Sequence, residues 1–243
     1  MSQVNIIELT DKDILDKIED HQKKNGVLRI SVFQIRENYL AELPDEYTAH
    51  LIVARQTLEK ENYLLNFGIN KIALKNKRLD FTYARTDFDK LDSSGQKLEL
   101  KQFLGPCFDL ERGKPLVRGQ LTNETLNSYF YYDSPETSSN KVDINQLVQE
   151  YEQSYPGEGW FMHAFAEPPY NMDLGKDIYV HGQYIIDFLD YFFGTLTSIT
   201  AYSWNNDCSP VFDPGKEWWG SYFWTVYNPE KQWYVGIIAS ETD

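Results

Sequence analysis

The sequence predicts an α+β fold, with mainly antiparallel sheets, packed helices and a β-hairpin at the C-terminal end. Helix-like and strand-like segments follow one another in irregular blocks, whereas a parallel α/β sheet needs a regular alternation. Several strand-like runs are separated by short turns, as in hairpins, and no internal repeat is visible. With 243 residues, the chain suits one large domain or two small ones.

In the first half of the chain, the pattern predicts two helices, a strand and a hairpin. The first helix has an N-cap candidate at Thr10 and ends at Asn25-Gly26. A run rich in β-branched residues then indicates a strand, and Pro44 begins a longer helix. The expected elements are a helix at 11–24, a strand at 27–36, a helix from Pro44 to before Gly68, hairpin strands at 69–74 and 79–85, and an irregular, strand-containing connection at 97–118.

In the second half, glycine and proline residues separate the elements. Pro156-Gly157 ends one helix, Pro168-Pro169 ends a strand, and Gly194 ends an apolar helix that we expect to be buried. The expected elements are helices at 121–132, 143–155 and 177–193, strands at 159–167 and 196–204, and a terminal hairpin of strands 222–227 and 233–239.

Charge and aromatic residues are unevenly distributed between the two halves. Residues 1–118 contain 19 Lys and Arg against 19 Asp and Glu, whereas residues 119–243 contain 4 against 18 and hold 27 of the 37 aromatic residues. We therefore expect a neutral α+β subdomain at 1–118 and an acidic, aromatic-rich one at 119–243. The polar stretch 133–141 is the linker candidate, and one compact domain is the alternative.

The composition indicates a soluble, cytoplasmic protein without a cofactor or a metal ion. Met1–Asp13 lacks the features of a signal peptide, and no apolar run is long enough to span a membrane. The four lysines of the acidic half cannot neutralise a phosphate backbone, so we expect no nucleic acid and no membrane as partner. Cys107 and Cys208 are far apart in the sequence and are expected to be free thiols.

The sequence contains no catalytic motif, and we assign no catalytic residue. Phosphate-binding loops, nucleophile elbows and zinc-protease helices are all missing. On the predicted strand 159–167, His163 and Glu167 share one face, but packing is the favoured role for that histidine. Cys208 needs a base such as His163 or His181 to act as a nucleophile, and the neighbouring Asp207 would raise its pKa. An enzyme is therefore the less favoured interpretation.

The most distinctive segment is a loop of turn residues and carboxylates that ends in a pair of tryptophans. Adjacent tryptophans on extended backbone point to opposite faces, so at least one is expected at the surface. Tryptophan beside carboxylates suits recognition of Arg or Lys. The predicted partner-binding residues are Trp204, Asp207, Asp213, Glu217, Trp218, Trp219 and Tyr222. Packing of the tryptophan rings over the core is the competing interpretation.

These observations favour a non-enzymatic intracellular binding or inhibitor protein of the immunity-protein type. Its acidic, aromatic surface would bind a basic protein partner, such as a toxin or nuclease domain. The alternative is a hydrolase, or a carbohydrate-binding or small-ligand module, with carboxylates and tryptophan platforms near 204–222. A third interpretation is a domain whose acidic charge only secures solubility.

Overall fold

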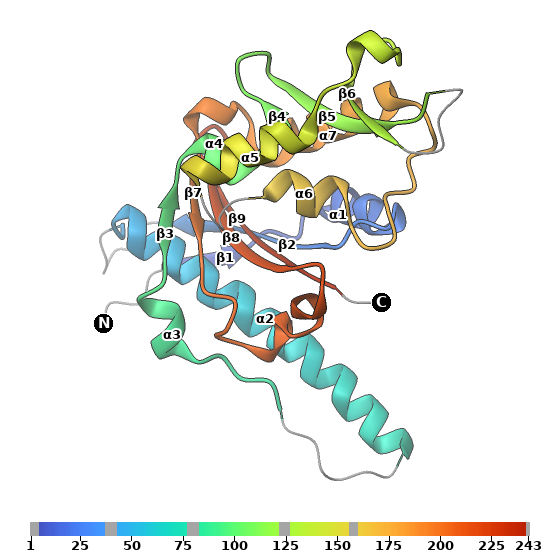
Figure 1. The fold of residues 1–243 in the computed structure, drawn as a ribbon. Helices are drawn as coiled ribbons and strands as arrows, with labels where there is room; N and C mark the ends of the chain where they lie inside the picture. The colour runs from blue at the N-terminus through green and yellow to red at the C-terminus, as the bar shows by residue number, and fades with distance from the viewer. Residues whose placement is uncertain (1–4, 37–42, 77–82, 122–126, 156–159, 242–243) are drawn as a thin grey trace.

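A computed structural model describes residues 5–36, 43–76, 83–121, 127–155 and 160–241 (Figure 1). The strands are β1 (Asn5–Glu8), β2 (Leu28–Arg36), β3 (Gln96–Leu98), β4 (Phe108–Asp109), β5 (Lys114–Gly119), β6 (Ser128–Tyr131), β7 (Thr200–Ser203), β8 (Ser221–Asn228) and β9 (Trp233–Ser240). The α-helices are α1 (Lys12–Lys23), α2 (Glu46–Asn76), α3 (Phe88–Asp92), α4 (Leu100–Leu104), α5 (Ile144–Ser154), α6 (Phe161–Ala166) and α7 (Ile178–Phe193). Short 3₁₀ helices are η1 (Ser138–Asn140), η2 (Leu196–Ser198), η3 (Pro210–Phe212) and η4 (Pro214–Glu217).

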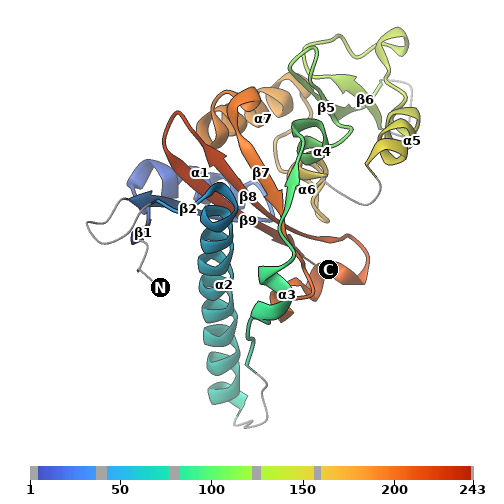
Figure 2. The ribbon, with the colours of Figure 1, turned by 90° about the vertical axis from the view of Figure 1, so that its left-hand side faces the viewer.

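The centre of the molecule is a six-stranded antiparallel sheet in the order β1-β2-β9-β8-β7-β3. Strands β8 and β9 form the predicted C-terminal hairpin and lie in the middle of the sheet, where nearly all their residues are buried. Helix α2 covers one face, and α7 lies against the other (Figures 1 and 2). Because both faces are covered, the two central strands are apolar on both sides. The α+β prediction is confirmed.

The sheet takes strands from both halves of the chain. Strand β2 pairs with β9, from Leu28 opposite Ala239 to Phe33 opposite Tyr234, and β3 pairs with β7. The linker candidate 133–141 contains a turn and η1 and connects β6 to α5. The division into two subdomains at this linker stays a prediction.

Helix α2 is longer than predicted and extends away from the sheet (Figure 2). Residues 69–74, expected as a strand, belong to this helix, and most of the expected partner strand lies outside the described residues. Gly68 does not end the helix, and a Cβ there would meet no other atom within 4 Å.

A row of asparagines four residues apart on the longer helix binds the returning chain. The Asn66 side chain donates from Nδ2 to the Ala84 carbonyl oxygen at 2.9 Å, and its Oδ1 accepts from Ala84 N at 2.7 Å. Asn62 donates to Thr86, and Tyr83 donates to Asn70. Residues four apart share one face of a helix, so these bonds favour helix over a local strand preference.

A second, three-stranded sheet, β4-β5-β6, lies across α7 from the main sheet, since α7 contacts both β5 and β8 (Figure 1). Helix α7 matches the predicted buried helix 177–193, with Asp177 as N-cap and Gly194 after its last residue. Gly182 permits this packing, because a Cβ there would lie 1.9 Å from Cβ of Tyr132.

Two predicted elements in this region are wrong. Residues 128–131, expected in a helix, form β6, and residues 122–126 of that prediction lie outside the described part of the chain. Residues 161–166, expected in a strand, form helix α6, where Phe161, Met162, Ala164 and Phe165 are all buried. A short apolar run buried on all sides shows no period, so pattern alone cannot separate strand from helix.

Candidate functional site

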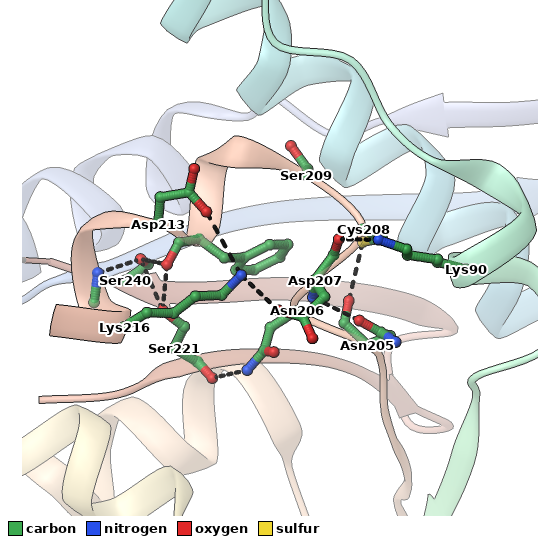
Figure 3. A network of polar contacts seen from close by, with 12 residues as sticks. Lys90, Asn205, Asn206, Asp207, Cys208, Ser209, Asp213, Lys216, Ser221 and Ser240 are labelled. Atoms are coloured by element: carbon green, nitrogen blue, oxygen red, sulfur yellow. Dashed lines mark hydrogen bonds and ion pairs between the residues drawn. The ribbon is translucent and has the colours of Figure 1, made fainter. Parts of the chain in front are cut away.

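The predicted partner-binding loop connects β7 to β8 and contains η3 and η4. It is fastened to the ends of β8 and β9: Ser221 and Ser240 both donate to the Phe212 carbonyl, and Ser240 accepts from Gly215 N at 2.9 Å (Figure 3). Gly215 leaves no room for a side chain, because a Cβ would lie 2.0 Å from the oxygen of Gly220. These contacts hold the backbone of the loop against the ends of β8 and β9.

Lys216 partly neutralises the carboxylates of this loop. Its Nζ lies 2.7 Å from Oδ1 of Asp207 and 3.5 Å from Oδ1 of Asp213 (Figure 3). The hydrogen bond from Lys216 lowers the pKa of Asp207 below its usual value. Asp207, Asp213 and Glu217 are all exposed. The three carboxylates with Lys216 give this surface a net charge of about −2, less negative than the carboxylates alone.

The two adjacent tryptophans differ in the way the sequence predicts. The Trp218 side chain is 56% exposed, whereas Trp219 is 8% exposed. Trp219 stacks on His163 and donates from Nε1 to the Glu167 carbonyl at 2.9 Å. Trp219 therefore fastens the loop to the end of α6, and Trp218 is left at the surface.

Trp204 and Tyr222, also predicted to bind a partner, are packed into the fold. Trp204 is buried, and half-buried Tyr222 stacks on Trp224 with ring centroids 5.2 Å apart. Of the seven predicted residues, the exposed ones are Asp207, Asp213, Glu217 and Trp218, and we call these four residues the Trp218 surface. A binding role for any of the seven stays a prediction.

Trp204 belongs to a buried network that the sequence pattern did not indicate. Its Nε1 donates to Oγ1 of Thr225 at 2.9 Å, and the same oxygen lies 2.7 Å from Nδ1 of His50. The Thr225 hydroxyl therefore accepts from the indole and makes a second hydrogen bond with the His50 ring. Nε2 of His50 lies 3.0 Å from Oγ1 of Thr200, so both ring nitrogens have a hydroxyl partner. These partners come from α2, β7 and β8, so only the folded sheet brings them together.

Neither cysteine has the environment of a nucleophile. Both are free thiols, as predicted, and both are buried. Burial raises the pKa of Cys208 to about 11 and that of Cys107 to about 12. The Cys208 thiol donates to the Asn205 carbonyl. Since the thiolate is the reactive form, both side chains are inert packing groups near neutral pH.

His163 lies beside a carboxylate, but that carboxylate is already engaged. On helix α6, Nδ1 of His163 is 3.7 Å from Oε2 of Glu167, four residues on. Arg118 makes a bidentate pair with Glu167, and the Tyr129 hydroxyl donates to the same group. Burial lowers the pKa of His163. This cluster joins β5, β6 and α6, and the predicted shared strand face of His163 and Glu167 is a helix face instead.

The described residues contain no group of three or more His, Cys, Asp or Glu side chains placed to hold a metal ion. Within the same described ranges, none of the helices has the length and apolar character that a membrane span requires. No protein-family model, curated protein or solved structure matches this chain.

Proposed function

We propose that the protein binds a basic protein partner through the Trp218 surface, as an intracellular inhibitor of the immunity-protein type would. The observation that carries the proposal is that the exposed Trp218 ring and three exposed carboxylates belong to one loop between β7 and β8. Aromatic anchors contribute a large share of the energy at protein interfaces. Arg and Lys of a partner can meet both the ring face and the carboxylates.

Two further properties support this function. The formal charge of −14 favours encounter with a basic partner. The loop is held by Ser221, Ser240 and Trp219 in the free protein. A preformed binding loop loses little conformational entropy on association, which suits an inhibitor that must bind tightly.

The alternative of a hydrolase or a carbohydrate module at 204–222 draws less support from the geometry. Glycoside hydrolysis needs two carboxylates on either side of the scissile bond. Here Lys216 lies between Asp207 and Asp213 and pairs with both. Its ammonium occupies the position that a substrate would need.

The test is binding to a partner captured at low ionic strength and then purified. The affinity of the purified partner should fall steeply with added salt. Asp213→Lys with Glu217→Lys, and separately Trp218→Ala, should each weaken binding by at least about tenfold, as expected for the loss of an interfacial anchor.

The matched control is Glu150→Lys with Glu152→Lys on α5, where both glutamates are exposed. This pair changes the net charge by the same amount at another surface. If the two double variants lose the same amount of affinity for the partner, only the overall charge of the protein matters for binding. Binding unchanged by Asp213→Lys with Glu217→Lys would contradict the proposal.

A further inference from the structure

Helix α2 carries a second row of residues four apart, beside the asparagine row that binds the returning chain (Figure 2). This second row consists of Glu59, Tyr63, Phe67 and Lys71, and we call it the α2 ridge. All four side chains are exposed. None of them belongs to the Trp218 surface, so an inference about the α2 ridge goes beyond the proposed function.

The middle of the α2 ridge is aromatic. Tyr63 is 68% exposed and Phe67 is 61% exposed. The two rings are neighbours, because residues four apart on a helix have their Cβ atoms about 5–6 Å from each other. Leu64, three residues before Phe67, is also 49% exposed. Single apolar side chains are ordinary on a protein surface, whereas a contiguous group of them marks an interaction site.

The order of residues along the α2 ridge indicates what covers it. Tyr63 and Phe67 lie at equal distances in sequence on the two sides of Leu65, and so do Glu59 and Lys71. In an antiparallel pair of α2 helices centred on Leu65, Glu59 of each copy faces Lys71 of the other, and the aromatic rings meet between them. A twofold interface requires such self-complementarity. A surface that binds a different protein does not.

The charges at both ends of the α2 ridge are available to a second copy. Among the described residues, neither Glu59 nor Lys71 forms an ion pair. Glu59 accepts one hydrogen bond, from Gln56 at 3.1 Å, and a carboxylate has further acceptor positions. Helix α2 contains four Lys and Arg against three Glu. The negative charge of the protein is therefore not concentrated where the two copies would meet.

We propose that two copies of this chain associate through the α2 ridge as a twofold dimer with antiparallel α2 helices. Ridges of residues four apart pack into each other when the helix axes cross at about −50°. The antiparallel direction places the two central sheets at opposite ends of the helix pair, because each α2 extends away from its own sheet (Figure 2). One helix pair makes a small interface, below about 1,200 Å², so the dimer should be weak, with a Kd on the order of 10 μM.

The first experiment is sedimentation equilibrium of the full chain at about 1 to 200 μM, a range that spans the expected Kd. The average mass should rise from that of one chain toward twice that value. Phe67→Ser should weaken the dimer at least about tenfold, because the ring is lost from both copies. The matched control is Leu15→Ser on α1, where the leucine is 48% exposed and its replacement should leave the dimer unchanged.

Charge reversal tests the antiparallel arrangement. Glu59→Lys and Lys71→Glu each place like charges at both ends of the helix pair, so each alone should weaken the dimer at least about tenfold. Combining both substitutions in one chain should restore the dimer. Mixing the two single variants should also restore it, as a dimer of one chain of each kind. Recovery in the mixture would show that both single variants are folded.

Controls for net charge are Glu152→Lys and Lys12→Glu, which change the charge by the same amounts at exposed positions elsewhere and should leave the dimer unchanged. Glu59→Lys makes the chain less negative, so weaker association of this variant cannot come from repulsion between the whole molecules.

Three results would overturn the proposal. The first is a single-chain mass of the parent protein over the whole concentration range. The second is an equal effect of Phe67→Ser and Leu15→Ser on the dimer. The third is a failure of both the combined variant and the mixture to dimerise better than the single variants.

Discussion

Two neighbouring tryptophans carry opposite roles at the end of one loop. Trp219 is buried and bonded to the Glu167 carbonyl, whereas Trp218 is more than half exposed. Trp219→Ala should lower the free energy of unfolding by about 3–5 kcal/mol, because it removes a packed ring and leaves a cavity. Trp218→Ala should change it by less than about 1 kcal/mol.

Urea denaturation of both variants measures this difference. The partner affinity should respond to Trp218→Ala even though stability does not. Equal destabilisation by the two substitutions would mean that Trp218 is also a core residue, and the Trp218 surface would lose its central member.

His50 makes stability depend on pH. Burial lowers its pKa from 6.5 to about 3, with a raising contribution from Glu46 and a lowering one from Lys97. Below pH 6.5 the unfolded chain binds a proton that the folded protein excludes, so stability falls as the pH drops from about 6.5 toward 3. At pH 5 the loss from this one group is about 2 kcal/mol relative to pH 7.5.

The variant His50→Gln isolates this contribution, since glutamine does not titrate. The variant should be less stable than the parent at pH 7.5. Between pH 7.5 and pH 5, however, its free energy of unfolding should fall by about 2 kcal/mol less than that of the parent. His21, whose pKa burial lowers to about 4, remains in both proteins. An identical pH dependence in urea denaturation would refute the role of His50.

At this scale the sequence singled out the loop, whose role in binding stays a prediction, and of the three tryptophans it named there Trp204 and Trp219 are buried and Trp218 is exposed. It indicated one exposed ring of the Trp218-Trp219 pair, since neighbouring side chains diverge. It could not indicate that Trp204 meets Thr225, because that contact depends on the register of β7 against β8. Lys216 was missed as well, since its two ion pairs require the turn through η4.

Among the secondary-structure elements, helix α7 holds the two sheets together, and Gly182 sets how closely it approaches the smaller one. Replacing a helical glycine by alanine normally stabilises a helix by up to about 1 kcal/mol. Gly182→Ala should instead destabilise the protein by about 1–3 kcal/mol, because the new methyl group meets Tyr132 and forces it to move.

The control is Gly68→Ala in the interior of α2. A Cβ at that position meets no atom within 4 Å, so helix propensity alone should decide and the variant should gain stability. Thermal denaturation of the two variants should therefore shift in opposite directions. A gain in both would mean that Gly182 of α7 and Tyr132 are not in close contact.

Elements with a clear period or clear ends were predicted correctly, whereas short apolar runs were not. Helices α1, α5 and α7 have acidic residues at their N-terminal ends, and α1 and α7 have glycine after the last turn. Helix α6 and strand β6 have neither an acidic residue at the N-terminal end nor a glycine after the last residue. Their form depends on what surrounds them: α6 is enclosed by aromatic rings such as Phe103 and Trp224, and β6 pairs with β5.

For the molecule as a whole, the central sheet makes each half of the chain depend on the other. Residues 1–118 contain β1, β2 and β3, which occupy the two edges of the sheet around β7, β8 and β9. Expressed alone, 1–118 should show no cooperative thermal transition by circular dichroism, because its strands lack their central partners. Adding a separately produced 119–243 fragment should restore the transition.

A cooperative transition of 1–118 on its own would instead support the two-subdomain organisation that the charge distribution suggested. The sequence could not decide between these outcomes. Charge and composition describe surfaces, whereas the order of strands in a sheet is set by pairings between residues about 200 positions apart.

This strand order also dictates what happens while the ribosome is still making the protein. Strand β2 ends at Arg36, and its partner β9 begins at Trp233, 197 residues later. At synthesis rates of about 5–20 residues per second, the apolar strand β2 waits on the order of 10 to 40 s for its neighbour. Throughout that interval the nascent chain displays an unpaired hydrophobic edge, and a chaperone that covers it should determine how much of the newly made protein escapes aggregation.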